Sequence, residues 1–119
     1  MTTVADYRGD DFYCDVALRR AMPLDVVHDD ERVLAYHHTK PFWEVHVVVI
    51  PKRHISSLTT VEPSDETDVR ALLRVVRDVA RTVEEEHGAA AVLTNLGAYQ
   101  DSKHLHIHVH SGPRRRHRP

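Results

Sequence analysis

The sequence predicts an α+β domain, with an antiparallel sheet of about five strands, one long helix and one short helix. Short runs rich in β-branched residues lie on both sides of a long segment in which apolar residues recur at three- and four-residue steps. The length of 119 residues fits one hydrophobic core and is too short for two domains of ordinary size. These observations predict a single domain with one sheet and one main helix.

The first third of the chain predicts a short helix followed by a hairpin. Residues 11–20 are the predicted helix, and Pro23 lies just beyond its end. Val26–His28 and Arg32–Tyr36 are predicted strands, and the acidic residues between them favour a tight turn.

The middle of the chain predicts a strand and the long helix. Val45–Ile50 is a strongly β-branched run that Pro51 closes. Ser64 supplies an N-cap hydroxyl for a helix that Gly88 is placed to end. The predicted inner face of this helix is apolar and the outer face is charged. The inner residues are Val69, Leu72, Leu73, Val76, Val79, Ala80 and Val83, and the outer residues are Arg70, Arg74, Arg77 and Glu84.

The last two predicted strands are Ala89–Thr94 and His104–His110, joined by a polar loop over residues 95–103. Histidine occupies every second position of the second strand, and aliphatic residues fill the places between. Because side chains alternate between the two faces of a strand, all four imidazoles are expected on one face. This pattern indicates a functional site. Its histidines are His104, His106, His108 and His110.

Composition excludes several classes of protein. A hydrophobic share of 41%, a charged share of 29% and a formal charge of -2 are ordinary for a globular protein. We therefore expect no general attraction to nucleic acid or anionic lipid. The longest apolar run, Val47–Ile50, is far below the roughly 20 residues of a membrane span. Cys14 is the only cysteine and the N-terminal residues lack the apolar core of a signal peptide, so we expect a cytoplasmic protein.

The histidine strand predicts chemistry at phosphorus. Imidazoles at this spacing cannot all carry charge, so most are expected to be neutral at pH 7, when the ring is a nucleophile, a base or a metal ligand. The preceding loop contains Asn95, Gln100 and Ser102, which suit the binding of phosphate oxygens without adding charge. Taken alone, His46 fits a buried structural histidine equally well, and Asn95 fits a turn. The combination favours nucleophilic attack by histidine on a phosphorus centre.

The segment His104-Leu-His-Ile-His-Val-His110 resembles the His-x-His-x-His-x-x motif of the histidine triad (HIT) family. The similarity extends to Arg32–Tyr36, to the Val-Val-Val-Ile-Pro-Lys-Arg-His-Ile run over residues 47–55 with His46 before it, and to Asn95. It implies a HIT-like fold over residues 11–112, with a flexible N-terminus over 1–10 and a basic tail over 113–119. Within the family, the chain is most similar to the HINT-like nucleoside phosphoramidase branch.

The resemblance also implies roles for the site residues. His106 would be the nucleophile, His104 and His46 would support it as a histidine relay, and His108 would contact a phosphate oxygen and assist proton delivery to the leaving group. Asn95, Gln100 and Ser102 would orient the phosphate. The adenosine would lie between the first helix and the hairpin, near residues that include Tyr13, Ala17, Met22 and Tyr36.

The implied activity is that of a purine nucleoside phosphoramidase that splits a P–N bond and releases a nucleoside monophosphate. The implied assembly is a homodimer, and no cofactor is required. Three alternatives remain open: a dinucleoside polyphosphate hydrolase or nucleotidyl transferase of the same family, a metal-binding histidine protein, and a binding module without catalysis.

The chain departs from the phosphoramidase branch at several positions. His38 stands at the ribose-binding position where that branch has an aspartate, and Asp101 stands where a phosphate-binding serine is usual. His110 replaces an apolar residue. Some relatives carry a structural zinc, and here Cys14, His54 and His104 are an incomplete set of ligands for it. These departures predict a specialised substrate and leave zinc as the weaker expectation.

Overall fold

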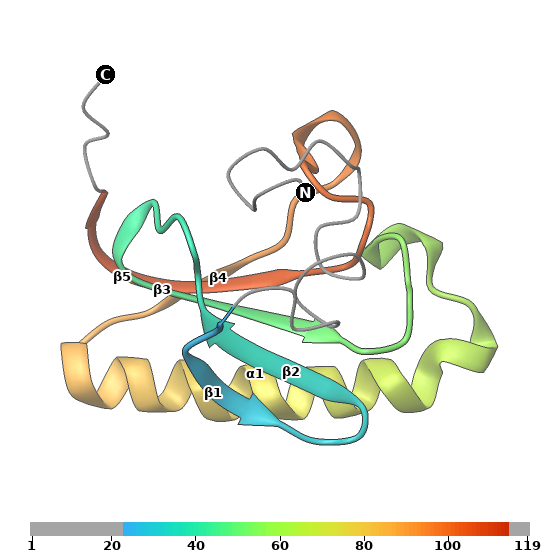
Figure 1. The fold of residues 1–119 in the computed structure, drawn as a ribbon, viewed down its shortest axis with the longest axis horizontal. Coiled ribbons are helices and arrows are strands. Elements are labelled where there is room, and N and C mark those ends of the chain that lie inside the picture. The colour runs from blue at the N-terminus through green and yellow to red at the C-terminus, as the bar shows by residue number, and fades with distance from the viewer. Residues whose placement is uncertain (1–22, 115–119) are drawn as a thin grey trace.

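A computed structural model describes residues 23–114, and in it five strands form one antiparallel sheet with a long helix across one face (Figure 1). The strand order is β1-β2-β3-β5-β4, so the last two strands extend the sheet beyond β3. The elements are β1 (Val26–Asp29), β2 (Val33–His37), β3 (Trp43–Pro51), α1 (Glu66–His87), β4 (Ala91–Leu93) and β5 (Ile107–Arg114). The predicted α+β class and five-stranded antiparallel sheet are confirmed. The short helix predicted over residues 11–20 lies outside the described residues.

Helix α1 begins close to the predicted N-cap and ends at the predicted glycine. Asp65, one residue after Ser64, is the N-cap residue. Gly88 adopts the left-handed conformation with φ of 82°, and its N–H donates to the backbone oxygen of Glu84 at 2.8 Å. Glycine adopts this conformation without the steric cost that a Cβ atom imposes, so it ends the helix cleanly.

The inner face of α1 differs from the prediction at one residue. Leu73 was predicted to face the core, but 53% of it is exposed, whereas Val75 is buried. The prediction was wrong because successive helix residues are turned by about 100°, so Leu73 lies more than a quarter-turn from Leu72 and past the edge of the apolar stripe. The predicted charged residues on the outer face are exposed. They are Arg70, Arg74, Arg77 and Glu84.

The two faces of the sheet have different partners. On one face, alternate residues of the central strands pack against α1 and form the main core, which includes Val47, Val49, Leu72 and Val109. The opposite face carries a smaller cluster of buried residues. Its members are Leu34, Tyr36, Val48 and Ile50. Because neighbouring residues of a strand point to opposite faces, the sequence Val47-Val48-Val49-Ile50 supplies both layers at once.

The ends of several strands differ from the prediction. β5 begins at Ile107 instead of His104, and it continues to Arg114. Residues 104–106 lie before the strand, where the N–H of Leu105 donates to the backbone oxygen of Ile55 at 2.6 Å. β4 spans only Ala91–Leu93, and β3 is longer than predicted. The main-chain partners of residues 104–106 therefore come from outside the β3–β5 ladder. Within the described residues, no helix is both long enough and apolar enough to span a membrane.

Candidate functional site

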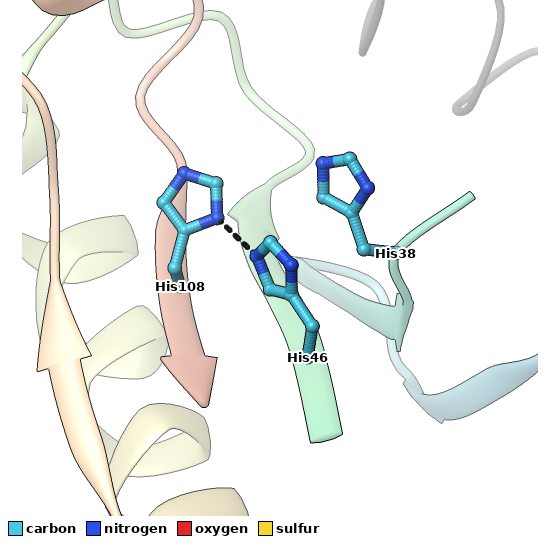
Figure 2. A group of neighbouring side chains, drawn as sticks. All are labelled: His38, His46 and His108. Atoms are coloured by element: carbon cyan, nitrogen blue, oxygen red, sulfur yellow. Dashed lines mark hydrogen bonds between the residues drawn. The ribbon is translucent and has the colours of Figure 1, made fainter. Parts of the chain in front are cut away.

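The face of the sheet opposite α1 carries a cluster of histidines. His46 lies on β3 and His108 on β5, and the strand register pairs Val48 with His108 and His46 with His110. His46 and His108 are therefore diagonal neighbours on one face. His38 follows β2 and completes the group (Figure 2). A loop and two strands of the sheet thus bring their imidazoles together.

Hydrogen bonds define which ring nitrogen of His46 and His108 carries the proton. The N–H of Phe42 donates to Nδ1 of His46 at 3.1 Å, so this nitrogen carries no proton. The proton of His46 is then on Nε2, which lies 2.8 Å from Nδ1 of His108 (Figure 2). His46 donates in this bond, and the proton of His108 is consequently on its own Nε2.

His106 has the opposite arrangement. Its Nδ1 lies 2.6 Å from the backbone oxygen of His104, and a carbonyl oxygen only accepts, so Nδ1 carries a proton. The neutral ring therefore has its lone pair on Nε2, the nitrogen that can attack. The ring centroids of His106 and His108 are 5.0 Å apart with the planes nearly perpendicular, at 84°. The ring with the lone pair, His106, and the ring with the N–H donor, His108, are thus neighbours in this site.

Thr94 and His104 hold the backbone around His106. The hydroxyl of Thr94 donates to the backbone oxygen of His106 at 2.7 Å, and Nε2 of His104 donates to the backbone oxygen of Pro51 at 2.8 Å. His104 is fully buried, and its ring contacts that of His54 with a centroid distance of 5.1 Å. The prediction that all four imidazoles form a row on one strand is wrong for His104 and His106, because the strand begins only at Ile107.

His38 and His110 extend the cluster by ring stacking. The ring of His38 stacks on His46 with a centroid distance of 4.4 Å and an interplanar angle of 19°. Its Nδ1 accepts the N–H of Lys40 at 2.9 Å, which leaves its proton on Nε2. His110 stacks on Trp43 at 3.6 Å and 11°. His38 therefore covers one side of His46, and Trp43 meets His46 edge-on at 4.9 Å.

Burial keeps these imidazoles neutral at pH 7. It lowers the pKa of His46 and of His108 from 6.5 to about 3, and the pKa of His38 from 6.5 to about 4. Neighbouring imidazoles lower the pKa of each ring further, and burial lowers the pKa of His110. The sequence predicted neutral rings from mutual repulsion. The direction agrees, but removal of the rings from water is the larger cause.

The geometry of the histidine cluster would suit a metal ion, but its hydrogen bonds do not. One nitrogen from each of His38, His46 and His108 lies within 4.8 Å of the others, a grouping that zinc can use with water as a fourth ligand. A metal-bound imidazole, however, usually donates its second N–H to an acceptor. Here the second nitrogens of His38 and His46 face the backbone N–H groups of Lys40 and Phe42. This polarity does not fit a bound cation.

The other predicted site residues are buried, are half-buried or fall outside the described residues. Gln100 is buried, and its amide nitrogen donates to the backbone oxygen of Ser56 at 2.6 Å. Ser102 is buried, and its hydroxyl has no hydrogen-bond partner among the described residues. Asn95 is half-buried and Tyr36 is buried. Tyr13, Ala17, Met22 and the predicted zinc ligand Cys14 fall outside the described residues.

Three contributors to the site were not predicted from the sequence. They are the backbone N–H of Phe42, the backbone oxygen of Pro51 and the ring of Trp43. The first two are main-chain groups, which every residue has, so no residue type could have marked them. Trp43 could not have been placed by alternation either, because it is three positions before His46 and the strand register shifts between Trp43 and Val45.

Comparison with known proteins identifies the family. The family model of the HIT domain matches residues 19–116. An uncharacterised 13.2 kDa HIT-like protein of Azospirillum brasilense is 34% identical over 100 residues, which cover 82% of each chain. With this fold and this arrangement of histidines, the chain belongs to the HIT family.

Solved structures share the fold. A histidine triad protein from Clostridium difficile has a TM-score of 0.74 and 27% identity, covering 95% of this chain and 99% of its own. A HIT family hydrolase from Clostridium thermocellum has a TM-score of 0.70 and 26% identity, covering 90% of this chain and 94% of its own.

Proposed function

We propose that the protein is a nucleotide hydrolase of the HIT type, and specifically a purine nucleoside phosphoramidase that cleaves a P–N bond. The observation that carries the proposal is the hydrogen bond from Nδ1 of His106 to the backbone oxygen of His104, which directs the lone pair of His106 to Nε2. The relative from Clostridium thermocellum is described as a hydrolase, which supports this class of reaction. The resemblance of the motifs to the phosphoramidase branch supports the substrate.

In the proposed first step, Nε2 of His106 attacks the phosphorus and the P–N bond breaks. The amine leaves with the electron pair of that bond and gains one proton from water. The new nucleotidyl-imidazole keeps its Nδ1 proton and is positively charged, a charge that the backbone oxygen of His104 stabilises. Covalent catalysis of this kind divides one difficult displacement into two easier ones.

In the proposed second step, water attacks the phosphorus, releases the nucleoside monophosphate and returns the lone pair to Nε2 of His106. The water loses one proton, which balances the proton that the amine gained. His108 acts in both steps as a neutral hydrogen-bond donor, because its Nδ1 accepts from His46 and its Nε2 carries the proton. An N–H donor beside the phosphate stabilises the charge that develops on the equatorial oxygens.

Ser102 is proposed to bind the phosphate. Its hydroxyl is buried and has no partner among residues 23–114, and a buried hydroxyl without a hydrogen bond destabilises the fold unless a ligand uses it. The half-buried amide of Asn95 lies in the same connection between β4 and β5 and is a second proposed contact. His38 is proposed to contact the substrate through its Nε2 proton.

The test is release of AMP from adenosine 5′-phosphoramidate, with and without EDTA. We compare the wild type with His106→Ala, and we use His87→Ala as the control because His87 is exposed at the end of α1, outside the site. Release that resists EDTA, persists in the control and falls at least a thousandfold in His106→Ala supports the proposal. Loss of release on adding EDTA would favour a metal site instead.

No release from the phosphoramidate would contradict the proposal and direct the test to dinucleoside polyphosphates. The same variants then separate a polyphosphate hydrolase from a binding module, because only the hydrolase turns over. Tight nucleotide binding without turnover in either assay would identify the binding module.

We also propose that the protein is a homodimer. Strand β4 lies at the edge of the sheet, and an edge strand presents backbone groups that can pair with a second chain. Val92 on this strand is 50% exposed and Leu73 on α1 is 53% exposed. Light scattering coupled to size-exclusion chromatography should give twice the chain mass of 13.7 kDa, and a single chain mass would contradict the dimer.

A further inference from the structure

We propose that the backbone amide of Phe42 is a positioning group of the site, because it fixes the tautomer of His46 and, through His46, the tautomer of His108. The catalytic consequence rests on the proposed hydrolase function. The tautomers themselves are properties of the free protein and can be measured without substrate.

Two hydrogen bonds link Phe42, His46 and His108, and both run in the same donor-to-acceptor direction. The N–H of Phe42 donates to Nδ1 of His46 at 3.1 Å, and Nε2 of His46 donates to Nδ1 of His108 at 2.8 Å. A backbone amide never accepts a hydrogen bond at nitrogen, so the first bond cannot be reversed. The second bond then has only one polarity, and Nε2–H of His108 is the free end of the chain.

The loop over residues 38–42 is anchored on His46 at two further points, so the amide of Phe42 is held in place. The N–H of His38 donates to the backbone oxygen of His46 at 2.8 Å. The ring of His38 stacks on the ring of His46 at 4.4 Å. Within the loop, the N–H of Lys40 donates to Nδ1 of His38 at 2.9 Å. The backbone of one short loop thus determines the proton positions of two rings.

The direction of these hydrogen bonds matters because His106 lies beside His108. Nε2 of His106 carries the lone pair, and an anionic phosphate must approach it. With the tautomer inferred from these hydrogen bonds, His108 presents an N–H to that phosphate. With the opposite tautomer, His108 would present a second lone pair, which repels the phosphate oxygens. The Phe42 amide therefore determines whether His108 attracts or repels the group that reacts.

The same polarity determines which kind of ligand suits the group of His38, His46 and His108. Each Nδ1 of His38 and His46 accepts a backbone N–H, and each Nε2 therefore carries a proton. The cluster offers N–H donors to an anion rather than lone pairs to a cation. We therefore expect zinc binding to be weak and to be unchanged in His38→Ala.

The test removes the backbone N–H of residue 42 by a substitution that leaves the length of the chain unchanged. Phe42→Pro removes the N–H, whereas Phe42→Leu keeps it and changes only the side chain. Lys40→Pro is the matched proline control, because it removes a different N–H of the same loop, the one that donates to Nδ1 of His38, and leaves the Phe42 amide intact. The nitrogen chemical shifts of the histidine rings, recorded in the free protein at pH 7, report which nitrogen of His46 and His108 is protonated.

In the wild type, in Phe42→Leu and in Lys40→Pro, we expect Nε2–H on both His46 and His108. In Phe42→Pro we expect a mixture of the two tautomers on both rings, with AMP release about tenfold slower than in Phe42→Leu, the factor that one hydrogen bond contributes. Folding of each variant is checked by the amide spectrum. If Phe42→Pro does not fold, the wild-type shifts still decide the tautomers.

Nδ1–H on His46 in the wild type would overturn the inference, as would an unchanged tautomer in Phe42→Pro. A shift of the His46 tautomer in Lys40→Pro would also overturn it, because the effect would then belong to the loop and not to the amide. The proposed tautomers without any AMP release would instead contradict the hydrolase proposal and leave the inference intact.

Discussion

Acidification from pH 7 to pH 5 should destabilise the protein, because His46 and His108 are held neutral in the folded state. The folded pKa of each is about 3, against 6.5 for an unburied imidazole. The unfolded chain therefore binds more protons than the folded chain between these values. The stability is fully present above pH 6.5 and is lost as the pH falls toward 3.

The magnitude follows from the distance between pH 5 and the unfolded pKa of 6.5. That distance is 1.5 pKa units, and each unit corresponds to about 1.4 kcal/mol, so each histidine costs about 2 kcal/mol at pH 5. The two together reduce the free energy of unfolding by about 4 kcal/mol. This is a large part of the 5–15 kcal/mol typical of a domain.

The assay is urea unfolding at pH 7, 6 and 5, followed by far-ultraviolet circular dichroism. His46→Asn removes one titrating ring, so its loss of stability between pH 7 and pH 5 should be smaller by about 2 kcal/mol. His87→Ala, at an exposed position, should keep the full dependence. Equal unfolding midpoints at pH 7 and pH 5 would refute the reasoning, and so would an identical pH dependence in His46→Asn and the wild type.

Four further substitutions test the structure. Ser102→Ala should stabilise the free protein by about 1 kcal/mol in thermal unfolding, because its buried hydroxyl has no partner among the described residues. If the hydroxyl binds phosphate, the same substitution should raise KM in the kinetic assay. A loss of stability would contradict the assignment. In urea unfolding, Leu72→Ala should lower the free energy of unfolding by about 3 kcal/mol and Leu73→Ala by less than about 0.5 kcal/mol, because only Leu72 is buried. Equal losses would mean that Leu73 also packs in the core. Gly88→Ala should cost about 1 kcal/mol, because its φ is 82° while the space around an added Cβ is open; a neutral result would mean that the backbone can relax.

The sequence predicted the fold through its periodicities. The alternation in Val47-Val48-Val49-Ile50 supplies both faces of the sheet, and the glycine at position 88 ends the helix in the left-handed conformation that only glycine adopts freely. Alternation alone could not locate the start of β5. The histidine pattern continues backwards through His104 without interruption, while the backbone partner of Leu105 is Ile55, outside the sheet. A strand ends where its hydrogen-bond partners end, and the type of a residue does not reveal which group its main chain bonds to.

The residues of the candidate site could be predicted from the sequence, but the ring nitrogens that carry the protons could not. The two-residue spacing indicated His106 and His108, and the resemblance added His46. Whether a neutral imidazole attacks or donates depends on the group that faces its other nitrogen. For His106 that group is a carbonyl oxygen and for His46 it is an amide N–H, so two rings of the same chemical type receive opposite roles. Both groups belong to the backbone and become known only when the chain is folded.

The additional histidines at positions 38 and 110 have a physical consequence that links the site to pH. At neutral pH they behave as aromatic packing residues, since His38 stacks on His46 and His110 stacks on Trp43. Protonation of His38 would place a positive charge against the ring of His46, and burial makes a charge on His38 or His110 costly. An aspartate at position 38 would stabilise a protonated His46 and raise its pKa, which would weaken the chain of donors that begins at Phe42. A neutral, stacking residue at this position therefore suits a site in which His46 must keep one tautomer and remain uncharged.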